Sequence, residues 1–205
     1  MKDIKKSLDV VDFVPNEDRI FAFLKGTTPE SIRAIIIGQD PYQRSQEAIG
    51  IAFSVPKRLG YITQSVKNIH KELELEYGSK FQDPRHASLR RWRSQQVLLI
   101  NSALTVPPYG RYHDPNDIRN KKHYDIWFSL IVTLLNYLTK MHNKMIIMMW
   151  GHIAKRFEDE IEKKPSFLYL FAPHPVNREG KFLGNGNFKA ADEYMGKRKV
   201  NWCDL

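Results

Sequence analysis

Residues 33–43 read RAIIIGQDPYQ, and this stretch carries the features from which the fold can be predicted. The apolar run Ala34–Ile37 ends at Gly38, and an amide, a carboxylate, a proline and a phenol follow it directly. Continuous apolarity, unlike alternation, is typical of a strand buried on both faces of a parallel sheet. A turn explains the glycine, but it does not explain why several hydrogen-bonding side chains follow it directly. We therefore interpret the stretch as a buried strand that leads into a functional loop.

Three further apolar runs have the same character, and patterns typical of helices separate them. The runs are 97–100, 145–150 and 167–172, and the helical patterns are 63–78, 124–141 and 152–164. Alternation of strand and helix patterns predicts a doubly wound α/β domain. We expect a single domain with three layers, α/β/α, around a central four-stranded, mostly parallel sheet.

Composition limits the class of protein and its partners. A chain of 205 residues suits one domain, and its formal charge of +9 favours a polyanionic partner. The single cysteine, Cys203, excludes an internal disulfide and a zinc site built from several cysteines. The N-terminal residues do not read as a signal peptide, and the longest apolar run is too short to span a bilayer. We expect no membrane association and an intracellular location, cytoplasmic or nuclear.

Polar residues follow the predicted strands, and ligands of open parallel sheets bind just beyond the carboxyl ends of the strands. The first run leads to Gln39, Asp40 and Tyr42, the second ends in Asn101, and His174 follows the fourth. We expect these side chains to meet in one crevice. His174 stands between two prolines, which restrict the backbone on both sides and suit a preorganised hydrogen bond.

Each of these residues also has a purely structural interpretation. Asp40 and Pro41 form a common turn initiator, and Asn101 can satisfy backbone groups in a loop. Phe53 is typical of a core, and His174 is as well explained by a structural role. The glycine-rich segment 184–190 lacks the spacing of a dinucleotide loop, and the sequence holds no phosphate loop, zinc-protease pair or nucleophile elbow.

The segments that carry these residues resemble, in order, the motifs of the uracil-DNA glycosylases of the main (family 1) type. They are IIIGQDPYQ (35–43), GIAFSVP (50–56), TQSVKNIHKEL (63–73), VLLINSALTV (97–106), IIMMWGHIAKRF (146–157), APHPV (172–176) and VNWCDL (200–205). The resemblance implies one glycosylase-like domain over residues 1–205, with an N-terminal helical segment at about 1–32 and a motif-bearing core at 33–205.

The resemblance implies hydrolysis of the bond between uracil and deoxyribose in DNA, as the first step of base excision repair. The enzyme would extrude its target nucleotide, release free uracil and leave an abasic site, with no lyase activity, metal or organic cofactor. Asp40 and His174 would be the catalytic residues. Asp40 would position water and favour the cationic sugar, and a neutral His174 would donate a hydrogen bond to the charge that develops on uracil O2.

The same resemblance assigns four residues to the uracil pocket. Phe53 would stack on the extruded ring, and the Asn101 amide would pair with N3–H and O4. Cytosine reverses that hydrogen-bonding pattern and would leave buried groups unpaired. Tyr42 would occupy the space of the thymine methyl group, and Gln39 would contribute backbone contacts and shape the water site.

DNA contacts are implied on either side of this pocket. They fall on Pro41, Gln64, Ser65, Lys67, Val176, Asn177 and Arg178. The family motif after the histidine contains a leucine that enters the duplex, whereas this chain reads HPVNREGKFLG (174–184). Arg178 is our candidate replacement. We expect Arg178→Ala to weaken activity on duplex DNA more than on single strands, and equal losses on both would reject this role.

Two further departures lie elsewhere, since Gln43 replaces the usual histidine after the tyrosine, and KRLGYITQS (57–65) lacks the usual run of prolines. The expected partners are uracil-containing DNA, single- or double-stranded, a proteinaceous glycosylase inhibitor and replication proteins, with the chain itself a monomer. The main alternative is a DNA-binding replication or processivity accessory that keeps the glycosylase fold. A glycosylase for mismatched thymine would favour a small residue in place of Tyr42.

Overall fold

A four-stranded sheet forms the centre of the molecule. The computed structural model describes residues 4, 7–8, 12–110, 118–177 and 181–205, with the backbone alone at 118–122. The strands are β1 (Ala34–Gly38), β2 (Val97–Asn101), β3 (Met145–Trp150) and β4 (Phe167–Ala172). Their order is β2-β1-β3-β4, and each neighbouring pair is parallel. The prediction of a central four-stranded sheet is confirmed, and the strands match the four apolar runs.

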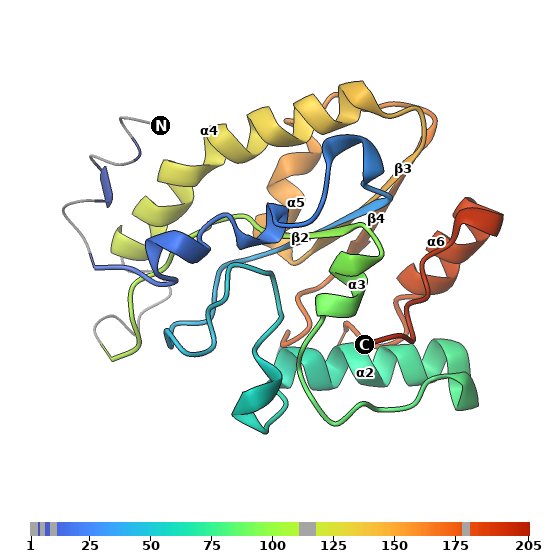
Figure 1. The fold of residues 1–205 in the computed structure, drawn as a ribbon. Helices are drawn as coiled ribbons and strands as arrows, with labels where there is room; N and C mark the ends of the chain where they lie inside the picture. The colour runs from blue at the N-terminus through green and yellow to red at the C-terminus, as the bar shows by residue number, and fades with distance from the viewer. Residues whose placement is uncertain (1–3, 5–6, 9–11, 111–117, 178–180) are drawn as a thin grey trace.

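Helices cover both faces of the sheet and complete the three layers (Figure 1). One face carries α2 (Gln64–Tyr77), α3 (Arg90–Ser94) and α6 (Asn187–Met195), and the other carries α4 (Ile118–Met141) and α5 (His152–Lys155). Strands β1, β2 and β3 are buried on both faces, which explains why they are apolar without alternation. The edge strand β4 is only partly buried, and its Phe171 is exposed. The predicted α/β/α single domain is therefore confirmed.

Successive residues of β1 supply the two cores. Ile36 points into the core shared with α2, α3 and α6, which includes Ile69 and Trp92. Ile35 points to the other face and belongs to the core that contains Trp127 of α4. All five of these side chains are at most 1% exposed. A polar substitution at any of them would bury an unpaired group.

Short 3-10 turns make up much of the rest of the chain. They are Glu17–Arg19, Ala22–Leu24, Pro29–Ser31, Lys57–Leu59, Gly78–Lys80, Arg156–Glu158 and Gly196–Arg198. The helical segment predicted at about 1–32 appears, from residue 12 onward, as three of these turns. Pro15, Gly26 and Pro29 interrupt that stretch, and such residues do not continue an α-helix.

Two helices differ from the sequence interpretation. Residues 152–164 were predicted as one helix, but α5 ends at Lys155 and a 3-10 turn carries the chain to Glu158. Helix α3 was not predicted, because its RRWRS segment has one apolar residue and no period to detect. None of the helices that the structure describes is long and apolar enough to cross a membrane.

Candidate active site

The candidate site begins where β1 and β2 end. Gly38, the last residue of β1, is paired with Asn101, the last residue of β2. Ser102 holds this junction, because its backbone N–H and its hydroxyl both donate to the Gly38 carbonyl, at 3.0 and 2.7 Å. The Ala103 N–H donates to the Gln39 carbonyl at 3.1 Å. The loop after β1 is therefore tied to the neighbouring strand from its first residue.

Phe53 and Asn101 meet above Gly38. A Cβ added to Gly38 would lie 2.8 Å from Asn101 Oδ1 and 2.9 Å from the Phe53 ring, so a larger residue does not fit there. Phe53 has a φ of 62°, a left-handed conformation that costs a non-glycine residue about 1–3 kcal/mol. The N–H of Ala52 donates to the Leu99 carbonyl of β2 at 3.1 Å. A strained backbone thus holds the aromatic ring beside the amide.

Tyr42 is held by two hydrogen bonds at its hydroxyl. It donates to the Phe53 carbonyl at 2.8 Å, and the Thr63 hydroxyl lies 2.8 Å away. Burial raises the pKa of Tyr42 to about 12, so the phenol stays neutral at any physiological pH. The ring is therefore a fixed, uncharged wall whose position depends on the loop before α2.

His174 is held as a neutral ring with a defined tautomer. Burial, with a smaller contribution from His152, lowers the pKa of His174 to about 4. The Val176 N–H donates to His174 Nδ1 at 3.3 Å, which leaves the proton of the neutral ring on Nε2. Gly151 lies against the side chain, where a Cβ would come within 3.2 Å of His174 Cβ. The His174 and Phe53 ring centroids are 5.7 Å apart.

Asp40 lies in the loop after β1 and is bound by a residue of α4. The Tyr124 hydroxyl donates to Asp40 Oδ2 at 3.0 Å. Burial raises the pKa of Asp40 to about 6, although hydrogen bonds from the Tyr124 and Gln39 side chains oppose the rise. Asp40 is therefore mostly a carboxylate at neutral pH, but it is easily protonated in mild acid.

A cavity of about 360 Å³ joins these groups. Its lining consists of Asp40, Pro41, Tyr42, Gln43, Arg44, Glu47, Phe53, Ser65, Tyr109, His174 and Val176. Among the described residues, Gln39 and Asn101 stand beside the cavity and do not line it. In that same part of the chain, no three His, Cys, Asp or Glu side chains gather as a metal site. A carboxylate, a neutral imidazole donor and an aromatic ring thus face one small space.

The remaining predicted DNA contacts lie around the start of α2 and the histidine loop. Gln64 donates to the Asn68 side chain at 3.1 Å, and Asn68 donates to the Pro175 carbonyl at 2.6 Å, which ties the two segments together. Lys67 and Asn177 are exposed. Arg178 lies outside the described residues.

Several cavity residues were missed by the sequence interpretation. Arg44 follows the first motif directly, lies over the Tyr109 ring at 4.8 Å and is 3.8 Å from Glu47. Its position beside that motif was a usable signal. Tyr124 gave no such signal, because only tertiary folding brings it to Asp40. Thr63 begins the motif-like segment 63–73, but only the tertiary structure shows its contact with Tyr42.

The fold is a three-layer α/β/α domain, and its cavity, with a carboxylate and a neutral imidazole, has room for one small planar ring. A family model described as "Uracil DNA glycosylase superfamily" matches residues 25–195. A uracil-DNA glycosylase of Dichelobacter nodosus is 33% identical over 201 residues, which is 96% of this chain and 82% of that protein. This chain belongs to the uracil-DNA glycosylase superfamily.

Solved structures give the same relationship. The crystal structure of mimivirus uracil-DNA glycosylase matches with a TM-score of 0.74 at 25% identity, over 87% of this chain and 64% of that chain. A mimivirus UNG variant in complex with UGI matches with a TM-score of 0.72 at 25% identity, over 86% and 65%. This chain therefore spans slightly less than two thirds of the mimivirus chains.

Proposed function

We propose that this chain hydrolyses the N-glycosidic bond between uracil and deoxyribose in DNA, as a monofunctional glycosylase of base excision repair. The observation that carries the proposal is the shared cavity of Asp40 and His174, with Phe53 and Tyr42 on its walls. Residues more than 130 positions apart in the chain supply the two polar groups that this reaction needs.

Base recognition in this proposal depends on shape and on one amide. The Phe53 ring stacks on the extruded base, and the Asn101 side chain beside it reads N3–H and O4. Tyr42 fills the position of a 5-methyl group and excludes thymine. The Tyr42 hydroxyl is bound by the Phe53 carbonyl and by the Thr63 hydroxyl. The ring therefore does not move aside to admit the methyl group. Gln39 contributes through its backbone and its contact with Asp40.

Bond breaking is assigned to two groups that stabilise the opposite charges of the separating uracil and sugar. The C1′–N1 bond breaks first, and its electron pair leaves with uracil, whose O2 accepts a hydrogen bond from His174 Nε2–H. The low pKa of His174 keeps the imidazole neutral, so the ring donates this hydrogen bond as a neutral N–H and not as an imidazolium. The Asp40 carboxylate stabilises the cationic sugar and positions water, whose oxygen bonds to C1′ and whose proton is released.

DNA binding is assigned to the rim of the cavity. We assign the strand contacts on one side to Pro41, Gln64, Ser65 and Lys67, and those on the other side to Val176 and Asn177. Arg178, expected to contact the duplex as well, lies outside the described residues. Arg44 stands at the cavity mouth beside Gln43, which replaces the family's usual histidine. We assign Arg44 the phosphate contact that this histidine would make.

The partners of the proposed enzyme follow from its substrate. Uracil-containing DNA is the primary partner, and an intracellular, cytoplasmic or nuclear location is where that substrate lies. The complex of a mimivirus relative with UGI supports a proteinaceous inhibitor for this chain also. The chain is proposed to act as a monomer. The replication-accessory alternative is not favoured, because its sequence support is confined to the altered loop after His174.

The proposal is tested by incubating the protein with uracil-containing oligonucleotides, single- and double-stranded, in the presence of a chelator. Alkali then cleaves any abasic site. We expect cleavage at uracil, none at thymine or cytosine, and a loss of at least about a hundredfold in Asp40→Asn. Asp125→Asn, an exposed residue of α4, is the matched control and should retain activity. Absence of alkali-labile product on every uracil substrate would overturn the proposal.

A further inference from the structure

A second cavity, of about 570 Å³, lies beside α3 and shares no lining residue with the candidate active site. We call it the α3 cavity. Its polar lining consists of Lys57, Arg58, Ser88, Arg90, Arg91 and Ser94.

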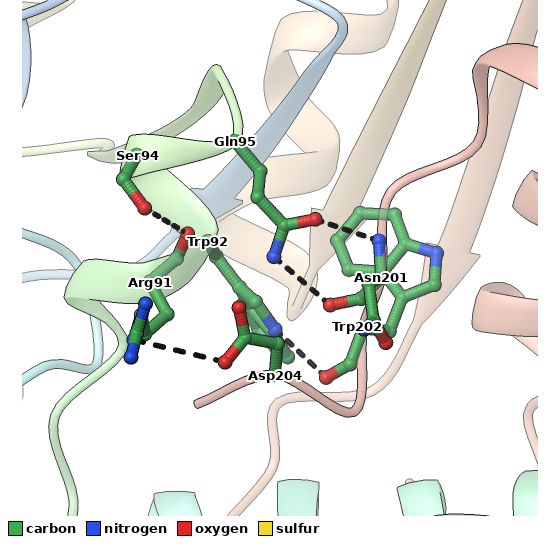
Figure 2. A network of polar contacts seen from close by, with 7 residues as sticks. All are labelled: Arg91, Trp92, Ser94, Gln95, Asn201, Trp202 and Asp204. Carbon is green, nitrogen blue, oxygen red and sulfur yellow. Dashed lines mark hydrogen bonds and ion pairs between the residues drawn. The ribbon is translucent and has the colours of Figure 1, made fainter.

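Charge is the main property of the α3 cavity. Four of its lining side chains are cations, and no carboxylate is among the described residues that line it. An ion pair of 3.7 Å joins one of these cations, Arg91, to Asp204 (Figure 2). Burial is the main cause of the lowered pKa of His86, and the positive charge of nearby Lys57 lowers it further. The cavity therefore keeps a surplus of positive charge, which attracts an anion.

The cationic helix is held in place by the C-terminal tail, as Figure 2 shows. The Gln95 side chain accepts from the Asn201 N–H at 2.7 Å and donates to the Asn201 carbonyl at 3.0 Å. Trp92, which is fully buried, donates from Nε1 to the Trp202 carbonyl at 2.9 Å. The backbone that carries Arg90 and Arg91 is thus fixed, and less ordering is needed when a ligand binds.

The wall of the cavity contains a buried polar group that its protein neighbours leave unused. Ser88 is 2% exposed, and within the described part of the chain its hydroxyl has no hydrogen-bond partner. Its backbone N–H is occupied, since it donates to His86 Nδ1 at 3.2 Å. Buried hydroxyls are normally paired. Because this oxygen has essentially no accessible surface, a rotation of the Ser88 side chain is needed to bring the hydroxyl to a ligand in the cavity.

The α3 cavity is joined directly to the segment that carries Phe53. The Leu89 N–H donates to the Ser54 hydroxyl at 2.9 Å, and the Val55 N–H donates to the Ala87 carbonyl at 3.0 Å. Lys57 is four residues from Phe53, so the two lie at most about 14 Å apart along the chain. With about 3.4 Å of helix axis per phosphate on one strand, this distance spans about four nucleotides.

We propose that the α3 cavity binds a phosphate group, supplied by the DNA strand within about four nucleotides of the extruded base. This inference rests on the proposed glycosylase function. Arginine forks bind the non-bridging oxygens of a phosphodiester in pairs, and lysine adds a point charge. The cavity extends the DNA contact surface beyond the rim of the active site. Free inorganic phosphate has the same chemistry and is the competing source.

The test uses Lys57→Gln/Arg90→Gln, which removes two exposed cations and leaves the Arg91–Asp204 pair intact. Two single-stranded substrates are compared, with about ten and about two nucleotides on each side of uracil. We expect KM for the long substrate to rise about tenfold, with KM for the short one and both kcat values unchanged. The slope of log binding constant against log salt should fall by about 0.7 for each phosphate that the variant no longer binds.

Lys197→Gln/Arg198→Gln is the matched control, with the same charges removed at the far end of α6. There Tyr194 donates to the Ser166 carbonyl, just before β4 begins, at the opposite edge of the sheet from the active site. An equal rise in KM in the control would show that net charge alone is responsible and would overturn the proposal. If no variant excised uracil, wild type included, the glycosylase function would fail, and the binding slopes would still decide on the cavity.

Two further measurements separate the remaining outcomes. Ser88→Ala should leave Tm unchanged, because no described residue pairs with the hydroxyl, and should weaken binding of the long substrate about threefold. A lower Tm of Ser88→Ala with unchanged binding of the long substrate would show that the hydroxyl has a structural role only. Inorganic phosphate is also titrated against both proteins in a thermal melt. A rise in Tm that the double variant loses, without any length-dependent change in KM, would overturn DNA as the source.

Discussion

At the residue scale, burial gives the two proposed catalytic groups different protonation states. It raises the pKa of Asp40 to about 6 and lowers the pKa of His174 to about 4, because it disfavours the charged form of each. Above pH 6 the carboxyl is ionised and the imidazole is neutral. These are the two forms that the proposed reaction uses.

The rate should therefore depend on pH through Asp40. We expect kcat to fall about tenfold per pH unit below about 6, since a protonated Asp40 no longer stabilises the cationic sugar. The Tyr124 hydrogen bond lowers the pKa of Asp40, so Tyr124→Phe should move the acidic limb of the pH–rate profile to higher pH. Tyr137→Phe, at an exposed position of α4, is the control. An unchanged profile in Tyr124→Phe would show that Asp40 does not set the limb.

Gly38 offers a second prediction at this scale. A methyl group there would meet Asn101 Oδ1 and the Phe53 ring at less than 3.0 Å, so both must move. We expect Gly38→Ala to lower kcat/KM on uracil DNA by about a hundredfold or more, because about 1 Å of misplacement has effects of this size. Circular dichroism would check that the sheet is intact. A near-normal kcat/KM would mean that Asn101 and Phe53 do not hold the base.

At the element scale, α2 binds the loop that begins α6. Glu72 accepts from the backbone N–H groups of Gly184 and Gly186, at 2.5 and 3.0 Å. One turn later, Glu76 accepts from Phe188 and Lys189, at 3.3 and 2.6 Å. The backbone N–H groups of the glycine-rich segment 184–190 thus bind two buried carboxylates. This explains its composition without any nucleotide.

Glu72→Ala should therefore destabilise the protein without touching the site. Two backbone donors lose their acceptor, at a cost of about 3 kcal/mol, and Tm should fall by roughly 6–12 °C. Glu74→Ala on the exposed face of α2 is the control and should shift Tm by little. Thermal melts of the two variants decide the matter. Equal Tm values would show that solvent replaces the lost acceptor.

At the scale of the whole molecule, the N-terminal turns belong to the same unit as the sheet. The Val14 and Val106 backbones exchange two hydrogen bonds of 2.9 Å. The Arg19 carbonyl lies against Gly50, where a Cβ would collide with it. Phe23, 1% exposed, joins the core on the α4 side. We propose that residues 1–205 therefore unfold together as one domain.

Phe23→Ala tests this directly. Loss of a buried phenylalanine costs about 3–5 kcal/mol, a large part of the stability of a single domain. We expect one cooperative melt at a Tm that is lower by roughly 6–20 °C. Leu24→Ala, in the same turn but 37% exposed, should have a small effect. A separate early transition, with the main melt unchanged, would show that the N-terminal segment folds on its own.

The sequence was sufficient to predict the four strands and the layer arrangement, because runs such as Ile35–Ile37 and Met145–Trp150 are apolar without alternation. The motif after β1 pointed to Asp40 and Tyr42 for a related reason, since polar side chains at a strand end need a partner or a ligand. The short helix α3 and the shortened α5 could not be predicted. Each has too few turns for a period, and packing alone makes it stable.

The amino-acid sequence by itself therefore determined the class of fold, the family motifs and the residue types of the proposed catalytic pair. Only the tertiary structure decided that Tyr124 supports Asp40, that Thr63 fixes Tyr42 and that the cations around α3 enclose a cavity. The physical reason is sequence distance. Local patterns report how a segment buries its own side chains, whereas these contacts join segments that become neighbours only when the sheet and its helices assemble.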